Sequence, residues 1–271
     1  MAGARVIRLR RPDTCSCCAA ALLAGVEAVW DSDARAVTCT ACAAPTSTPD
    51  PGVAGASVRA EGERRRAAEE ERRRHRVERR PVLGRIANAI AGPPTAGAAH
   101  LKGAIGEEKF GAALDTMTAH GVLILHDRRR PRTAANIDHL AIAAGGVWVI
   151  DAKRYAGRIE RIDKGGWRKV DYRLVVGGRD RTNLVDGVES QIADVRGLLD
   201  AALPTEVRVL GALCFVDGDF ALFAKPFALG DVLVTWGKAL RERLTEPGPL
   251  DAQARTLVYE RLASKLPPAR V

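Results

Sequence analysis

Two aspartates and a lysine lie on neighbouring apolar segments in the middle of the chain. Asp138 belongs to the run 137–142, while Asp151 and Lys153 end the run 147–153, and both runs are rich in strand-forming residues. The four residues between the runs include Gly145 and Gly146 and are enough to reverse the chain, so the sequence predicts a β-hairpin. Side chains alternate along a strand, which places Asp151 and Lys153 on one face.

The register of this hairpin predicts how the two carboxylates lie relative to each other. If Ile142 pairs with Val147, Asp138 lies directly opposite Asp151, with Cβ atoms about 5 Å apart. Two facing carboxylates repel each other unless a cation lies between them. Mg²⁺ and Mn²⁺ take one or two carboxylates, with water and substrate phosphate completing the shell. The pattern therefore predicts a divalent-metal site for phosphodiester hydrolysis, in which the Lys153 ammonium orients water and stabilises charge. A surface Asp and Lys near a strand end is the simpler alternative, because D-x-K is a common pattern.

Four segments of the chain follow one another in an order that is informative as a set. They are Gly103-Ala-Ile-Gly106-Glu107, Asn136-Ile-Asp138-His139, Val149-Ile-Asp151-Ala-Lys153-Arg-Tyr155-Ala-Gly157 and the segment from Asn183 to Gln191. In this order they resemble the NERD family (nuclease-related domain), a branch of the PD-(D/E)xK nuclease-like superfamily. The resemblance covers residues 102–199. No proline precedes Asp138, although the name of the superfamily includes one.

The resemblance implies a fold and a set of roles. The fold is α/β, a restriction-endonuclease-like core in which a mixed central sheet is flanked by helices. Asp138 and Asp151 would bind Mg²⁺ or Mn²⁺, and Lys153 would be the catalytic lysine. Glu107 matches the acid of the first helix, and Gln191 matches a polar residue near the site of related nucleases.

Simpler interpretations of the two helix residues remain open. Glu107 fits an ordinary first-turn acid that offsets the helix macrodipole. Gln191 lies next to an apolar helical stripe that includes Val188 and Ile192, and it fits a helix-surface residue. His139 points away from Asp138 on its strand, which favours a structural role.

The N-terminal cysteines form a second pattern. Cys15-x-x-Cys18 and Cys39-x-x-Cys42 are separated by twenty residues, a spacing typical of four-cysteine zinc sites. Segments 26–30 and 35–38 between them are expected to form two short strands, so the sequence predicts a small zinc ribbon with Zn²⁺ on these four thiolates. Two disulfides are the alternative, although nothing indicates an oxidising compartment. Cys17 is a spare thiol. Cys214 lies in an apolar run and is expected in a buried strand.

Composition sets the outer limits. The 271 residues are 46% hydrophobic, enough for one medium core and small appendages. No signal-peptide pattern begins the chain, and charges interrupt every apolar stretch before it reaches membrane-spanning length. We therefore expect a cytoplasmic protein without a membrane partner, and the preference for Arg over Lys is typical of GC-rich bacterial coding sequences.

Charge and turn residues suggest three parts: a zinc ribbon at 1–45, a linker at 46–97 and the nuclease-like domain at 98–271. The linker combines Pro/Gly-rich flanks with a run between Arg59 and Arg80 that holds ten Arg and six Glu. We expect a solvated, partly helical spacer there, with a DNA-binding arm as the alternative. The net charge of +9 points toward polyanions, and the run from Arg128 to Arg132 is placed for phosphate contacts or forms a solvated loop.

Two functions from different classes agree with these residues. One is a metal-dependent nuclease acting on nucleic acid, DNA foremost, with the ribbon aiding recognition. The other is a non-catalytic module that keeps the nuclease fold and binds nucleic acid, or a protein partner through the ribbon or the linker. The set of Asp138, Asp151 and Lys153 favours the nuclease, because a binding module does not need facing carboxylates.

Overall fold

The computed structural model describes residues 4–16, 18–32, 35–43, 49–92, 98–166, 170–199, 207–216 and 218–269. The chain divides into two compact units, Met1–Asp50 and Pro51–Val271. Within the residues described, none of the helices has the length and apolar character that a membrane span requires. The predicted three-part division at 1–45, 46–97 and 98–271 stays a prediction.

The first unit is a small β structure. Strands β1 (Ala4–Arg8), β4 (Glu27–Asp31) and β5 (Ala36–Cys39) form an antiparallel sheet, and β2 (Asp13–Thr14) pairs with β3 (Ala21–Leu22). A short helix, α1 (Thr40–Ala43), follows β5. The core is only a few side chains, with Leu9, Ala28 and Val37 at its centre. The two strands expected between the cysteine pairs are confirmed as β4 and β5, and a core this small makes a metal a natural source of further stability.

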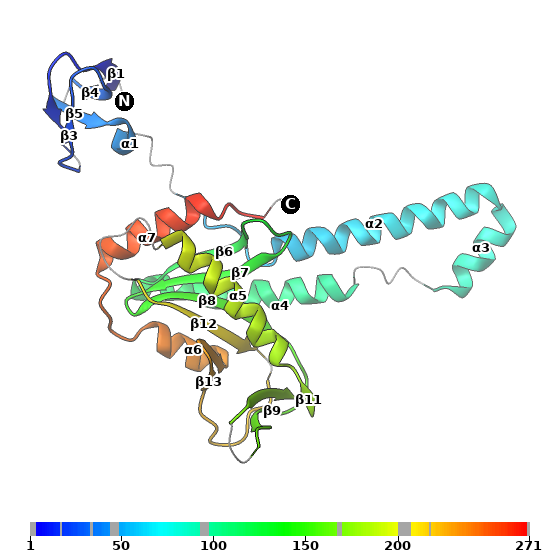
Figure 1. Ribbon diagram of the computed structural model, residues 1–271. Coiled ribbons are helices and arrows are strands. Elements are labelled where there is room, and N and C mark those ends of the chain that lie inside the picture. The colour runs from blue at the N-terminus through cyan, green and yellow to red at the C-terminus, as the bar shows by residue number, and fades with distance from the viewer. Residues whose placement is uncertain are drawn as a thin grey trace. The chain divides into compact units, whose positions relative to one another are not determined.

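A six-stranded mixed sheet forms the centre of the second unit (Figure 1). Its strand order is β13 (Phe227–Leu229), β14 (Val232–Thr235), β12 (Val209–Phe215), β8 (Gly146–Lys153), β7 (Asn136–Ala143) and β6 (Leu123–Arg129). Strand β12 pairs in parallel with both β8 and β14, and the other pairs are antiparallel. The predicted mixed α/β sheet is confirmed.

Helices bury both faces of this sheet. On one face, α5 (Thr182–Leu199) and α7 (Ala252–Lys265) pack their apolar stripes against alternate residues of β7, β8 and β12. The other face of the sheet carries the strand residues that alternate with these. It is covered by α4 (Ala98–Asp115), the 3-10 helix η1 (Thr116–His120) and α6 (Gly237–Leu244). Because each strand contributes to both cores, its register is fixed from two sides.

A crossover connects the two central parallel strands. After β8 the chain forms a small antiparallel sheet of β9 (Ile159–Asp163), β10 (Tyr172–Val176) and β11 (Arg179–Asp180), and then enters α5 before returning as β12. Parallel pairing requires such a return. The start of α5 therefore lies at the end of the sheet where β8 and β12 finish.

Two further helices of the second unit form a hairpin. These are α2 (Ala56–Arg79) and α3 (Pro81–Ile90) (Figure 1). At Gly62 of α2 an added Cβ would lie 3.1 Å from Leu101 Cγ, so α2 packs closely on α4. Gly84 of α3 allows the helices of the hairpin to meet, because a Cβ there would lie 2.5 Å from the carbonyl oxygen of Arg76. The charged segment is helical from Arg59 to Arg79, and Arg80 separates the two helices.

The arginine run before β7 is largely used by the fold itself. Arg128 is 1% exposed, and its guanidinium donates to the carbonyl oxygens of Leu266, at 2.6 Å, and Ala263, at 3.0 Å. These carbonyls belong to the C-terminal end of α7, whose last turn lacks intrahelical partners. Arg130 forms an ion pair with Asp194 of α5, at 2.6 Å. The expectation that Arg128 contacts phosphate is wrong, because the side chain is buried and its donors are occupied.

Arg128→Ala is expected to destabilise the protein. The change leaves two buried carbonyls unpaired and opens a cavity, which together cost about 3 kcal/mol of the free energy of unfolding. Arg129→Ala, which removes an exposed side chain, is the control and should stay within about 0.5 kcal/mol. Urea unfolding followed by circular dichroism measures both, and equal effects of the two substitutions would contradict the assigned role.

Candidate active site

The hairpin of β7 and β8 has the register expected from the sequence. Ile142 pairs with Val147, and the ladder continues to His139 and Ile150. The next positions along it are Asp138 and Asp151, where the regular pairing ends. Asp151 is 7% exposed and Asp138 is half-buried. Their side chains share the face of the sheet that α5 covers, because they alternate with residues of the opposite core.

A third acid on the neighbouring strand is already satisfied. Asp127 of β6 adopts a left-handed backbone conformation, with φ at 47°. Its carboxylate accepts hydrogen bonds from the Ser57 amide at 2.6 Å, the Ser57 hydroxyl at 2.8 Å and Asn136 Nδ2 at 2.9 Å. These donors stabilise the ionised form without a cation. Asp138 and Asp151 have a different environment, described next.

Asp138 and Asp151 interact unfavourably with each other. Burial, and then the negative charge of Asp151, raise the pKa of Asp138 well above its ordinary value, while Lys153 acts in the opposite direction. Lys153 Nζ lies 2.6 Å from Asp151 Oδ1. That contact is an ion pair without hydrogen-bond geometry, so among the described residues Asp151 Oδ1 is buried with no hydrogen-bond partner. One ammonium therefore faces two carboxylates.

The charge of Lys153 is maintained by the same acids. Burial alone would lower the pKa of Lys153, but Asp151 and then Asp138 raise it, and the net effect is upward. The lysine is therefore protonated and positioned as a cation beside the carboxylates. A protonated lysine can stabilise negative charge in a transition state, but it cannot act as a general base.

Glu107 of α4 reaches the same end of the sheet. It lines a cavity of about 290 Å³ together with Lys153, Arg154 and Tyr155. Burial raises the pKa of Glu107 to about 7, Lys153 opposes that shift, and Asp127 and Asp151 add to it. The helix begins at Ala98, so Glu107 is not in its first turn, and the simpler interpretation as a first-turn acid is wrong.

Close backbone contacts hold Glu107 in place. A Cβ on Gly106 would lie 2.7 Å from Arg154 Cδ, so Arg154 extends across the helix next to Glu107. Gly55 has φ at 71°, and a Cβ there would lie 3.3 Å from Glu107 Cβ. Glycine is needed at positions 55 and 106 because the loop before α2 and the segment that follows β8 both pack directly on α4.

Gln191 lies on α5 beside the stripe that packs on the sheet. Its Oε1 atom is buried and has no hydrogen-bond partner within the described parts of the chain. The structure gives no bond between Gln191 and either aspartate. A buried acceptor without a donor costs free energy unless water or a ligand satisfies it, so this atom is available to a donor that the protein itself does not supply.

His139 lies on the opposite face of the sheet and is structural, as expected. It is fully buried, and its Nδ1 lies 2.8 Å from His126 Nδ1, while His126 Nε2 lies 2.8 Å from Asp115 Oδ1. Burial, and then the neighbouring His126, lower the pKa of His139 to about 3. The ring is therefore neutral and joins β6, β7 and the end of α4.

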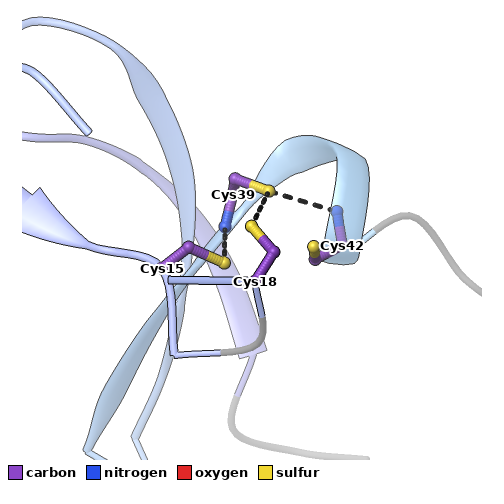
Figure 2. A group of neighbouring side chains, drawn as sticks. All are labelled: Cys15, Cys18, Cys39 and Cys42. Atoms are coloured by element: carbon purple, nitrogen blue, oxygen red, sulfur yellow. Dashed lines mark hydrogen bonds between the residues drawn. The ribbon is translucent and has the colours of Figure 1, made fainter. Parts of the chain in front are cut away.

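The four cysteines of the first unit form a second candidate metal site (Figure 2). The sulfur atoms of Cys15, Cys18, Cys39 and Cys42 lie within 4.8 Å of one another. The Cys39 amide donates to Cys15 Sγ at 3.2 Å, and the Cys42 amide donates to Cys39 Sγ at 3.4 Å. Amide donors of this kind stabilise thiolates.

The sulfur spacing distinguishes a metal cluster from disulfides. Cys18 Sγ and Cys39 Sγ are 3.9 Å apart, whereas a disulfide requires about 2.05 Å and a tetrahedral zinc tetrathiolate about 3.8 Å. Cys18, Cys39 and Cys214 form no disulfide with another described residue. Cys17, the predicted spare thiol, lies outside the described residues. The cluster is consistent with a zinc ribbon.

The remaining thiol is inert. Cys214 is buried in β12, as expected, and burial raises its pKa to about 12. A protonated, enclosed thiol is a poor nucleophile and a poor metal ligand.

Comparison with known proteins agrees with this geometry. Residues 102–216 match the family model described as nuclease-related domain, or NERD. Over these residues the chain is similar to the nuclease-related domain family. The match extends past the expected end at 199 and includes the whole crossover through α5 and β12, and with it all five predicted site residues. Neither a curated protein nor a solved structure matches the chain.

Some residues of the site carried little signal in the sequence. Arg154 and Tyr155 line the cavity, and only their position directly after Lys153 could have indicated it. Ser57 and Asp127 are far apart in sequence and meet only in the fold. A larger cavity of about 660 Å³ lies at β13, β14 and α6 and contains none of the five predicted site residues.

Asp138→Asn should stabilise the metal-free protein. Removing one of two repelling carboxylates is expected to raise the free energy of unfolding by on the order of 1 kcal/mol in EDTA. The matched control on the adjacent strand is Asp127→Asn, which weakens satisfied hydrogen bonds and should lower stability by about 1–2 kcal/mol. Urea titrations in EDTA compare the three proteins under identical metal-free conditions. Loss of stability in both variants would contradict the repulsion.

Zinc content tests the cysteine cluster. We expect about one zinc ion per purified chain and close to none in Cys39→Ser, because a tetrahedral structural site needs all four ligands. Cys214→Ser, which removes the buried thiol outside the cluster, should keep the full content. Elemental analysis measures both, and zinc retained by Cys39→Ser would show that the cluster is not the site.

Proposed function

We propose that the nuclease-related domain hydrolyses phosphodiester bonds of nucleic acid, DNA foremost, with Mg²⁺ or Mn²⁺ held by Asp138 and Asp151. The observation that carries this proposal is the pair of neighbouring carboxylates, Asp151 buried and Asp138 half-buried, with Lys153 Nζ 2.6 Å from Asp151 Oδ1. Such a pair destabilises the fold unless a cation is bound, and a module that only binds has no need for it.

The donor set fits a hard divalent cation. Asp151 Oδ1 is a buried oxygen without a hydrogen bond, and the raised pKa of Asp138 shows that its charge is incompletely compensated by the protein. Hard oxygen donors of this type suit Mg²⁺ and Mn²⁺ and do not suit soft metals. A bound cation would stabilise charge on the scissile phosphate and lower the pKa of water.

The protein's own groups have separate roles in this proposal. Lys153 stabilises negative charge that develops on the phosphate and orients the attacking water. Glu107, with a pKa of about 7, exchanges a proton with that water near neutral pH, which is where a general base works best. Gln191 offers its unsatisfied Oε1 as an acceptor that fixes a water.

We further propose that Cys15, Cys18, Cys39 and Cys42 bind Zn²⁺ as a structural ribbon. The support is the sulfur cluster together with the amide donors that favour thiolates. A zinc-thiolate cluster in place of disulfides fits a reducing compartment, the cytoplasm. Contact of the ribbon or the α2 segment with nucleic acid or with a protein partner stays a prediction.

Lys153→Ala is expected to lower the turnover number for DNA cleavage by about 10²–10³-fold, because it removes a positioned charge from the transition state. The control is Lys164→Ala, an exposed lysine at the end of β9, which should cleave like wild type. Plasmid, linear duplex and single-stranded DNA are incubated with Mg²⁺ or Mn²⁺, and products are quantified on gels.

Two outcomes decide the proposal. Cleavage by wild type that is lost in Lys153→Ala but retained in Lys164→Ala supports a catalytic site. If every substrate stays intact with wild type, or if Lys153→Ala cleaves as well as wild type, the catalytic assignment fails. The domain is then a binding module with a nuclease fold.

A further inference from the structure

Arg181 occupies an unusual position at the start of the crossover helix. It lies between β11 and α5, and its backbone amide donates to the carbonyl of Leu174 at 2.8 Å, which fixes the residue on the small sheet. Its guanidinium carbon lies 5.2 Å from the centre of the Tyr155 ring. Stacking of this kind holds an arginine side chain in one orientation.

Among the described residues the guanidinium of Arg181 has no hydrogen bond and no ion pair, and its contact is with the Tyr155 ring. Its Nε is buried and makes no hydrogen bond. Two other arginines of this unit pair with acids, Arg173 with Asp171 and Arg196 with Asp231. An arginine with a buried, unsatisfied donor next to an aromatic ring is positioned to bind an anion that the chain does not supply.

Tyr155 connects Arg181 to the candidate active site. Tyr155 lines the cavity of about 290 Å³ that is also lined by Glu107 and Lys153. The ring packs edge-on against Phe215, with centroids 6.3 Å apart, and Phe215 itself pairs with Lys153 across β12 and β8. The ring is therefore fixed to the end of the sheet, and Arg181 is held on it at the same end as Lys153.

We infer that Arg181 is a phosphate-binding residue that holds the nucleic-acid backbone next to the scissile phosphate. This inference rests on the proposed function. The planar guanidinium presents paired N–H donors that match two phosphate oxygens, and Tyr155 pre-organises it. Because each backbone phosphate is the same, this contact positions the substrate and does not read its sequence.

Binding measured without turnover tests the inference. A short fluorescein-labelled duplex and the corresponding single strand are titrated with the full chain in Ca²⁺, and anisotropy gives Kd at several salt concentrations. Arg181→Ala should raise Kd about 10-fold and lower the salt slope by about one, since one phosphate contact is lost. The control Arg173→Ala, an arginine of the same small sheet that is paired with Asp171, should change Kd less than about twofold.

A second variant keeps the test informative if Arg181→Ala folds poorly. Arg181→Lys retains the charge but loses the planar fork and the stacking, so Kd should rise about threefold with an unchanged salt slope. Wild-type Kd and slope in Arg181→Ala, or an equal loss in Arg173→Ala, would overturn the inference, as would absence of binding by the wild type.

Failure of this inference is distinguishable from failure of the proposed function. Cleavage in Mg²⁺ and anisotropy in Ca²⁺ are therefore measured separately on wild type and on Arg181→Ala. If wild type binds through Arg181 but does not cleave, the phosphate contact stands and the catalytic assignment falls. If wild type cleaves and Arg181→Ala binds and cleaves equally well, only the phosphate contact is rejected.

Discussion

The repulsion between Asp138 and Asp151 is the constraint on which the rest of the second unit depends. Neither carboxylate can move away from the other without breaking the hairpin, because β7 and β8 are fixed by their hydrogen-bond ladder and by apolar residues on both faces. A sheet with only one buried face could relieve the repulsion by a shift in the register of its strands. Here a slip would expose one core and bury charge in the other, so the stability of two hydrophobic layers maintains an electrostatically unfavourable site.

The topology determines which residues reach that site. A parallel pair of β8 and β12 requires a long return, and that return brings the small sheet and the first turn of α5 to the end of the sheet where Lys153 lies. Helix α4 approaches the same end from the other face and places Glu107 there. The site thus combines three segments, each on a regular element, and rigid elements position side chains more accurately than loops do.

The sequence predicted what depends on short-range periodicity. Alternation along residues 137–153 and the intervening Gly-Gly turn were enough to predict the β7–β8 register, and the two C-x-x-C pairs were enough to predict the sulfur cluster. Long-range packing was not predictable. Arg128 was expected at phosphates, but it is buried beneath the end of α7, more than a hundred residues away. The environment of Glu107 also depends on where its helix starts and on a loop from residues 51–55. The local sequence pattern around Glu107 does not specify either of them.

Net charge is a poor guide to where a polyanion would bind this chain. Most of the arginines in α2 face acids one turn away, as Arg65 faces Glu61 and Arg66 faces Glu70, and such exposed pairs cancel charge locally. Arg128 is enclosed and Arg130 is paired. A residue that binds a polyanion is therefore not identified by its place in a basic run. It is identified by a guanidinium or ammonium whose charge is not balanced by other groups of the fold. Lys153 is shared between two carboxylates, so its compensation changes when a cation occupies the pair. With a divalent cation balancing the two carboxylates, the positive charge of Lys153 would be left for a substrate phosphate at the end of the sheet.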